Sequence, residues 1–125
     1  MDKSKKGKAS REKGARGERL LVHFLKEHGL DVKRGFVWLH QSDLIGLDGI
    51  HIECKAQEKA TVRQWLSQAV EESQKRKDGL PAVFWKKNRA GWVTIMRTED
   101  WIILYKLARG IKDDTVRGDS AIHEE

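Results

Sequence analysis

The sequence predicts an α/β fold in which a central mixed β-sheet is flanked by helices, with the element order α-β-β-β-α-β-β-α. Three observations lead to this prediction. Apolar residues recur at helical spacing in residues 13–28 and 61–77. Short runs of β-forming residues lie between and after these two stretches. A length of 125 residues is enough for one domain with a buried core.

The two long helices have recognisable ends. In the first, four apolar residues between positions 20 and 25 fall on one stripe, and Gly29 is suited to end the helix. The second begins at a Thr-x-x-Gln capping box, residues 61–64. Basic residues 75–77 lie in its last turn, where cations complement the helix dipole, and Gly79 follows. Each helix therefore has an apolar side that a sheet can cover.

The strands are shorter than the helices and less regular. Residues 32–39 are rich in β-forming residues, although Gly35 favours a bend or a bulge there. Residues 43–46 and 50–55 flank the tripeptide Leu-Asp-Gly and predict a hairpin. The remaining predicted elements are strands at residues 82–86 and 92–96 and a short helix at residues 99–108.

One domain, residues 11–109, is expected between two polar ends. Residues 1–10 are expected to be a flexible basic arm, and residues 110–125 an acidic, disordered tail, because neither has much to bury. No apolar run reaches the ~18 residues of a membrane span. The single cysteine excludes an intramolecular disulfide and a Cys-cluster zinc site. We therefore expect a cytoplasmic protein with no membrane partner.

The charge of the chain is unevenly distributed. Lys and Arg number 25 against 19 Asp and Glu, which gives a formal net charge of +6 and a pI near 9.5. Residues 1–19 and 75–97 hold most of the positive charge. Such a balance indicates a polyanionic partner. A solvated basic surface with no partner is an equally good interpretation of the pI alone.

The segment SDLIGLDGIHIECK, which begins at Ser42, predicts where two carboxylates meet. If Leu-Asp-Gly is a three-residue loop, Asp43 lies opposite Glu53 on one sheet face, with Cβ atoms about 5 Å apart and Lys55 beside them. A two-residue loop would instead pair Asp43 with Cys54. The hydrophobic pattern does not distinguish the two registers, and we prefer the first because it groups the charges.

Two adjacent carboxylates repel each other, so their grouping calls for a cation. One interpretation is a surface salt bridge with Lys55, which would contribute little stability. The other is a site for Mg²⁺, for which carboxylate oxygens are suitable ligands and Mn²⁺ is expected to substitute. There the metal would polarise a phosphodiester, and Lys55 would orient water or stabilise the transition state.

Several motifs occur in this sequence in an order similar to that found in one known family. The motif KGARGER at residues 13–19 is followed by the amphipathic helix, by Arg34, by Ser42-Asp43 and by Glu53-Cys54-Lys55. In this order the sequence resembles the archaeal-type Holliday junction resolvases of the PD-(D/E)xK nuclease superfamily, over about residues 12–96. The resemblance implies a restriction-endonuclease-like core and a Mg²⁺-dependent phosphodiesterase. It also implies that the cytoplasm in question is that of a prokaryote, an archaeon or the host of a phage.

The resemblance also implies roles for individual residues. Asp43 and Glu53 would be metal ligands, Lys55 the catalytic lysine, and Glu18 an additional acidic residue at the metal. Ser42 stands where the superfamily often has proline, a position that shapes the backbone without supplying a ligand. Arg19 and Arg34 match basic residues used on DNA phosphates, and the other expected DNA contacts are Lys3, Lys5, Lys6, Lys8, Lys13 and Arg16.

Further side chains are weaker candidates for the site. Gln68 follows the motif on the second long helix, where related nucleases sometimes use a glutamine, although an ordinary helix flank is a slightly better interpretation. His51 shares the face of Glu53 and could touch a phosphate, but a lone strand histidine is usually half-buried. Trp65 and Trp101 are expected in the core.

The expected function is a Mg²⁺-dependent, structure-selective DNA endonuclease that resolves four-way junctions as a homodimer. One alternative is a nicking or restriction-like DNA nuclease of the same superfamily. Another is a catalytically silent DNA-binding module with this fold. The segments 36–39 and 101–107 are the expected apolar surfaces for dimer formation.

Overall fold

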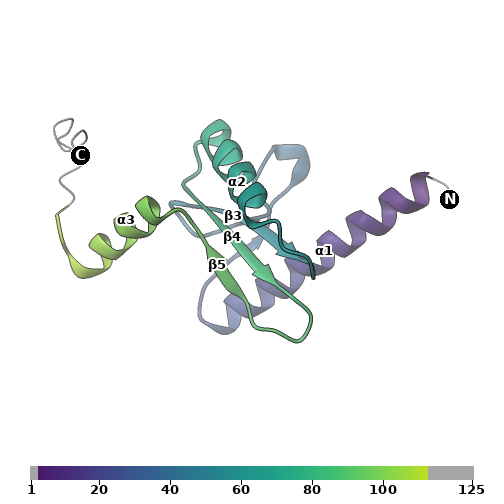
Figure 1. The fold of residues 1–125 in the computed structure, drawn as a ribbon, viewed down its shortest axis with the longest axis horizontal. Helices are drawn as coiled ribbons and strands as arrows, with labels where there is room; N and C mark the ends of the chain where they lie inside the picture. The colour runs from purple at the N-terminus through teal and green to yellow at the C-terminus, as the bar shows by residue number, and fades with distance from the viewer. Residues whose placement is uncertain (1–2, 113–125) are drawn as a thin grey trace.

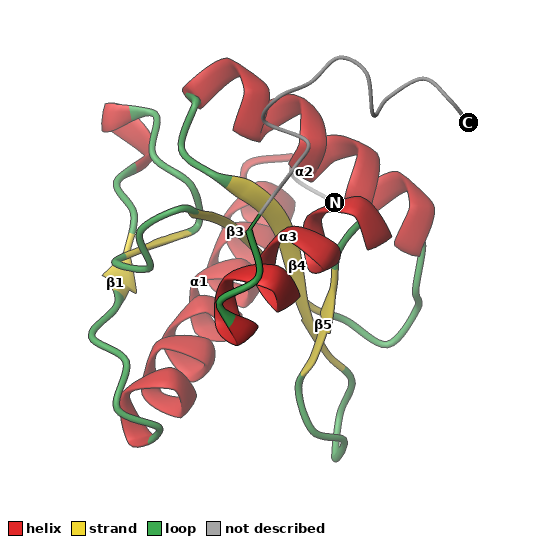
Figure 2. Ribbon diagram, turned by 90° about the vertical axis from the view of Figure 1, so that its left-hand side faces the viewer, coloured by secondary structure: helices red, strands yellow, loops and turns green. Residues whose placement is uncertain are grey.

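The computed structural model describes residues 3–112, which form five strands in one mixed sheet and helices on both of its faces (Figures 1 and 2). The spatial strand order is β1-β2-β3-β4-β5, with β3 and β4 parallel and the other neighbours antiparallel. The predicted fold class and element order are confirmed. The elements are α1 (Lys3–Glu27), β1 (Lys33–Arg34), the 3-10 turn η1 (Val37–Leu39), β2 (Leu44–Ile45), β3 (Ile50–Ala56), α2 (Val62–Arg76), β4 (Leu80–Lys86), β5 (Val93–Ile95) and α3 (Thr98–Arg109).

The N-terminal helix begins earlier than the sequence pattern indicated. α1 starts at Lys3, so residues 3–10, the greater part of the segment expected to be a flexible arm, form its first turns. This stretch has no proline, and four of its eight residues are lysine, whose helix propensity allows the helix to continue without tertiary contacts. Figure 1 shows this end of α1 extending beyond the sheet. Residues 1–2 and 113–125, including most of the predicted tail, lie outside the described part.

The predicted strand over residues 32–39 is reduced to two residues by Gly35. A Cβ atom on Gly35 would lie 1.9 Å from the carbonyl oxygen of Ser42, so the two backbones approach too closely for any side chain. The Gly35 N–H donates to the carbonyl of Asp43 at 2.9 Å. The chain then turns into η1, which leaves Val37 and Trp38 exposed. The close backbone contact holds β1 against the segment that carries Asp43.

The sheet is covered on its two faces by different helices. One core lies under α1 and consists of buried aliphatic side chains, and the other lies under α2, where Trp65 and Ala69 pack on Val83. The predicted core position of Trp65 is confirmed, whereas Trp101 is 53% exposed on α3, contrary to expectation. Figure 1 shows why, since α3 extends to the side of the sheet. The α1 core comprises Leu21, Leu25, Val32, Leu44 and Ile52.

A glycine allows α1 to approach the end of β3. A Cβ atom on Gly17 would lie 2.8 Å from the Cβ of Ala56 and 3.9 Å from the sulfur of Cys54. Any larger residue would therefore separate the helix from the strand. This contact places Glu18, the next residue, near the edge where β2 and β3 meet. No helix among residues 3–112 is long and apolar enough to cross a membrane.

Candidate active site

The hairpin between β2 and β3 has the register that places the two carboxylates opposite each other. Leu44 pairs with Ile52, and the Asp43 N–H donates to the carbonyl of Ile52 at 3.2 Å. Gly49 adopts the left-handed conformation with φ of 87°, as the three-residue loop requires. The preferred register is confirmed, and Asp43 lies across from Glu53.

Alternation along β3 separates the site from the core. Ile52 is fully buried in the α1 core, and Cys54 packs against the same cluster. His51, Glu53 and Lys55 therefore lie on the opposite face, which α2 covers. Burial raises the pKa of the Cys54 thiol, with nearby carboxylates as the next cause, so this cysteine is an uncharged packing residue.

The side-chain carboxyl group of Asp43 is held against β3. Its Oδ2 accepts a hydrogen bond from the backbone N–H of Cys54 at 2.8 Å. The pKa of Asp43 is raised to about 7, first by burial and then by the charge of Glu53, against the lowering effect of the Cys54 hydrogen bond. Glu18 also raises it, by its charge. Carboxyl groups this close favour retention of a proton unless a cation takes its place.

The donor set fits a divalent cation with few protein ligands. Among residues 3–112, no group of three or more His, Cys, Asp and Glu side chains converges closely enough to hold a metal ion unaided. Mg²⁺ usually binds through only one or two carboxylates, and waters and substrate phosphates complete its shell. Asp43 and Glu53 provide two carboxylates whose mutual repulsion a cation would relieve.

Lys55 and Gln68 come together on the face that α2 covers. The Nζ atom of Lys55 donates to Oε1 of Gln68 at 3.5 Å. The slightly favoured interpretation of Gln68 as an ordinary flank is therefore incomplete, because its amide reaches the lysine of the predicted motif. The sequence signal for this position of Gln68 was its helical spacing from Trp65. The buried side chain of Trp65 fixes which side of α2 faces the sheet.

Glu18 forms an ion pair that the sequence did not indicate. The Nε atom of Arg34 donates to Oε1 of Glu18 at 2.9 Å, and the Glu18 side chain is 20% exposed. Arg19 pairs with Glu12 at 3.2 Å. Arg19 and Arg34, two of the three arginines expected to contact DNA, are thus paired with carboxylates in the protein alone. The role of Glu18 as a further metal ligand stays a prediction.

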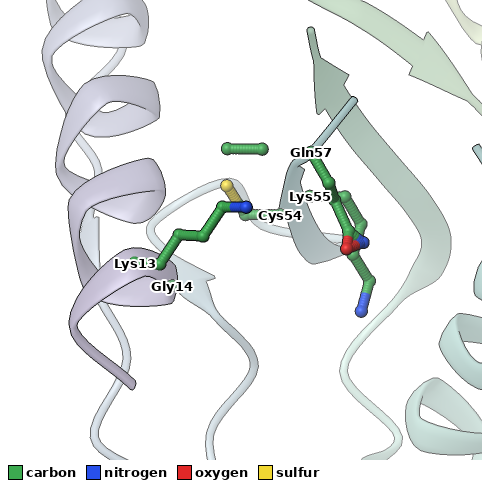
Figure 3. Close-up of a pocket in the computed structure, with 6 residues that line it drawn as sticks. Lys13, Gly14, Cys54, Lys55 and Gln57 are labelled. Carbon is green, nitrogen blue, oxygen red and sulfur yellow. The ribbon is translucent and has the colours of Figure 1, made fainter. Parts of the chain in front are cut away.

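Basic side chains line hollows beside the C-terminal end of β3. A pocket of about 330 Å³ is lined by Lys13, Gly14 and residues 54–57, and Figure 3 shows Lys13 reaching from α1 toward Cys54. A second hollow of about 320 Å³ is lined by Lys13 and Arg16, among others. Lys8 is exposed on α1. The backbone of Lys3, Lys5 and Lys6 belongs to α1, and their side chains lie outside the described part.

Ser42 and His51 are both buried, with different consequences. The Ser42 hydroxyl donates to the carbonyl of Leu44 at 2.6 Å, a local bond that shapes the backbone next to Asp43. His51 is fully buried, so the interpretation that it touches a phosphate is wrong. Its two ring nitrogens lie at hydrogen-bonding distance from Glu53 and Asp78, and these bonds raise its pKa against the lowering effect of burial.

Asp78 was missed by the sequence reasoning. It lies in the loop between α2 and β4, 27 positions after His51, and local spacing gives no sign that the two residues meet. The contact between Asp78 and His51 could have been inferred only from the sheet topology. If β4 is parallel to β3 and starts near residue 80, the loop before it lies beside the start of β3.

Comparisons with known proteins give a single kind of match. No family model matches the sequence, and no curated protein matches it. Among solved structures, the fold is similar to Hjc from Archaeoglobus fulgidus, a Holliday junction resolvase from an archaeal hyperthermophile. The two chains are 25% identical, with 67% of this chain and 72% of that chain covered, and the TM-score is 0.49. The neighbour is of the family that the sequence motifs resemble.

Proposed function

We propose that this protein is a metal-dependent endodeoxyribonuclease that cuts four-way DNA junctions. The observation that carries the proposal is the register of the β2–β3 hairpin, which sets Asp43 across from Glu53. Lys55 follows two residues later on the same face, with Gln68 bonded to it. Paired carboxylates with an adjacent lysine are suited to the hydrolysis of phosphodiesters, and the motif order resembles that of the junction resolvases.

Asp43 and Glu53 would hold Mg²⁺, with Mn²⁺ as a substitute and Glu18 as a further acidic neighbour. When bound, such an ion polarises a phosphodiester and makes a water molecule more acidic. The carboxylates also need the ion, because Asp43 otherwise retains a proton near neutral pH. Metal and proton therefore compete for the same pair of groups.

Lys55 would act on the reacting phosphate through its charge. Its ammonium group donates hydrogen bonds and accepts none, so it can orient a water molecule or offset negative charge that develops on phosphate oxygens. The hydrogen bond to Gln68 at 3.5 Å limits the positions of the flexible side chain. Gln68 is thereby proposed to support Lys55 rather than to bind the metal.

DNA phosphates would bind along the basic end of α1 and the adjoining hollows. Lys13 and Arg16 line these hollows beside the end of β3, so a strand bound there would pass close to Lys55. Arg34 is bonded to Glu18 in the free protein. A phosphate can compete for this guanidinium, because Arg binds phosphate and carboxylate with the same bidentate geometry. A phosphate can compete in the same way for the guanidinium of Arg19, which is paired with Glu12.

Preference for a junction and dimer formation follow from the family resemblance. A four-way junction is two-fold symmetric, and its resolution needs paired cuts, so two copies related by a two-fold axis would supply two sites. Val37 is 88% exposed, Trp38 73% and Leu107 69%, which leaves apolar surface on both segments expected to form the interface. A nicking or restriction-like nuclease would use the same carboxylates on another DNA form.

A panel of DNA substrates tests the proposal. Labelled four-way junction, linear duplex, flap and single strand are incubated with the protein in Mg²⁺, in Mn²⁺ and in EDTA. We expect paired cuts in the junction with either metal, much weaker cleavage of the other forms, and none in EDTA. Equal cleavage of duplex would favour the restriction-like alternative. Tight binding without cleavage under all conditions would favour the silent DNA-binding module.

A further inference from the structure

Three side chains form a continuous hydrogen-bonded chain from the surface to the candidate metal site. The Nε2 atom of His51 lies 2.8 Å from Oε2 of Glu53. On the other side of the ring, Nδ1 lies 2.8 and 2.9 Å from the two carboxylate oxygens of Asp78. The side chain of His51 is fully buried, that of Glu53 is 9% exposed, and that of Asp78 is 31% exposed. The series of hydrogen-bonded side chains thus ends at an accessible aspartate.

The imidazole ring is fixed at both ends by these contacts. Each ring nitrogen faces a carboxylate oxygen, so rotation of the ring would break one bond or both. A buried polar group that loses its partner is costly, which keeps the ring in this orientation. The bond to Nε2 in turn limits the orientation of the Glu53 carboxylate. The bond engages Oε2 of Glu53.

Asp78 is itself held by the backbone around it. It lies between Lys77 and Gly79, which both have positive φ, of 52° and 129°. A Cβ atom on Gly79 would lie 2.3 Å from the carbonyl carbon of Gly49, so the loop is packed against the β2–β3 turn. The Leu80 N–H also donates to the Gly49 carbonyl, at 2.8 Å. The carboxylate of Asp78 is therefore presented to His51 from a backbone with little freedom.

We propose that His51 is a positioning residue that, held by Asp78, fixes the Glu53 carboxylate in the orientation that binds the divalent metal. This inference rests on the proposed function. His51 touches neither metal nor substrate, because it is buried and both ring nitrogens are engaged. Groups that orient a ligand in this way affect metal affinity nearly as much as the ligands do, commonly by about 10- to 100-fold.

The test uses Asp78, since it lies at the accessible end of the hydrogen-bonded series and is not itself a buried core residue. Asp78→Ala removes the partner of His51, and Asp78→Asn keeps an oxygen acceptor while removing the charge. Asp48→Ala is the matched control, because Asp48 is exposed and lines the same shallow pocket as Asp78. Binding of Mn²⁺ is measured by electron paramagnetic resonance without DNA, and circular dichroism checks the fold.

We expect Asp78→Ala to weaken Mn²⁺ binding by about tenfold. Asp78→Asn should recover most of the affinity, and Asp48→Ala should stay within about twofold of the wild type. The Mg²⁺ concentration for half-maximal junction cleavage should rise in Asp78→Ala by the same factor, with cleavage at saturating Mg²⁺ much less affected. A residue that only packs the interior would change thermal stability and leave the Mn²⁺ affinity unchanged.

Three results would overturn the proposal in distinguishable ways. If folded Asp78→Ala binds Mn²⁺ as tightly as the wild type does, the hydrogen bonds from Asp78 through His51 do not position Glu53. If Asp48→Ala loses as much Mn²⁺ affinity as Asp78→Ala, the loss is explained by the removal of a surface negative charge. A wild-type protein that binds no Mn²⁺ would overturn the proposed function itself, and this inference with it. If Asp78→Ala does not fold, Asp78→Glu displaces the carboxylate by one methylene, and unchanged affinity there would also contradict the proposal.

Discussion

The carboxylate of Asp43 is bonded to the backbone N–H of Cys54 at 2.8 Å, directly beside Glu53 on the neighbouring strand. This bond fixes one carboxyl group next to another in a largely buried position. The structure therefore stores a repulsion that a proton relieves at low pH and that a divalent cation would relieve at higher pH.

The stability of the metal-free protein should fall as the pH rises through about 7. The folded-state pKa of Asp43 is about 7, above its ordinary value of 3.8, so its contribution is fully present below 3.8 and is lost as the pH rises through 7. His51 acts in the same direction, because its pKa is also raised. We expect unfolding in EDTA to require less free energy at pH 8.5 than at pH 5.5, by on the order of 1 to 3 kcal/mol.

Asp43→Asn is the control for this pH dependence. The amide cannot ionise, so the variant should be more stable than the wild type at pH 8.5 and should depend less on pH. Thermal unfolding followed by circular dichroism measures both proteins. Identical pH profiles for the two would show that Asp43 does not retain a proton in the folded state.

Lys55→Ala should abolish cleavage while leaving metal binding nearly intact. The lysine is expected to act on water or on the transition state, so its loss removes catalysis without removing a ligand. Gln68→Ala should reduce cleavage by a smaller factor, because it removes only the group that holds Lys55 at 3.5 Å. Single-turnover cleavage and Mn²⁺ binding separate the two effects. Loss of Mn²⁺ binding in either variant would contradict this division of roles.

Gly17→Ala should destabilise the protein, although alanine normally favours a helix. Its Cβ would lie 2.8 Å from the Cβ of Ala56, which forces α1 away from β3 at an expected cost of about 1 to 3 kcal/mol. At Gly14 a Cβ meets nothing within 4 Å, so Gly14→Ala should stabilise the helix by about 0.5 to 1 kcal/mol. Urea unfolding measures both. Equal effects at the two positions would show that α1 does not pack on β3 through Gly17.

Removal of residues 1–10 should weaken DNA binding and flatten its salt dependence. The segment carries Lys3, Lys5, Lys6 and Lys8, and each lysine that contacts a phosphate releases counterions. Titration of junction DNA at several salt concentrations gives the slope. A slope unchanged by the deletion would show that this end of α1 does not contact DNA.

The parts of the fold that local patterns specify could be predicted from the sequence. The alternation from Ile50 to Lys55 defined two faces, and the Leu-Asp-Gly tripeptide was compatible with a loop of two or three residues. The register that sets Asp43 opposite Glu53 was preferred because it groups the charges, and the pattern alone did not require it. The start of α1 was missed because helix propensity, without apolar periodicity, extends it. In this region the periodic signal marks only the part that packs on the sheet.

Contacts between distant segments were beyond the reach of such patterns. The pairs Glu18–Arg34 and His51–Asp78 are separated by 16 and 27 positions. Each depends on where a loop or a strand lies after the sheet has formed. Neither has a spacing rule of the kind that governs a helix face or a hairpin, so charge and residue type alone could not reveal them.

The most direct test of the central claim is junction cleavage by Glu53→Gln in Mg²⁺. The substitution keeps the size of the side chain and an acceptor for His51 but removes a negative ligand, so the sheet should survive and metal affinity should fall. We expect cleavage to drop by about 100-fold or more, while junction binding holds or tightens because a negative charge near the phosphates is lost. A folded Glu53→Gln protein that cuts at the wild-type rate would contradict the account.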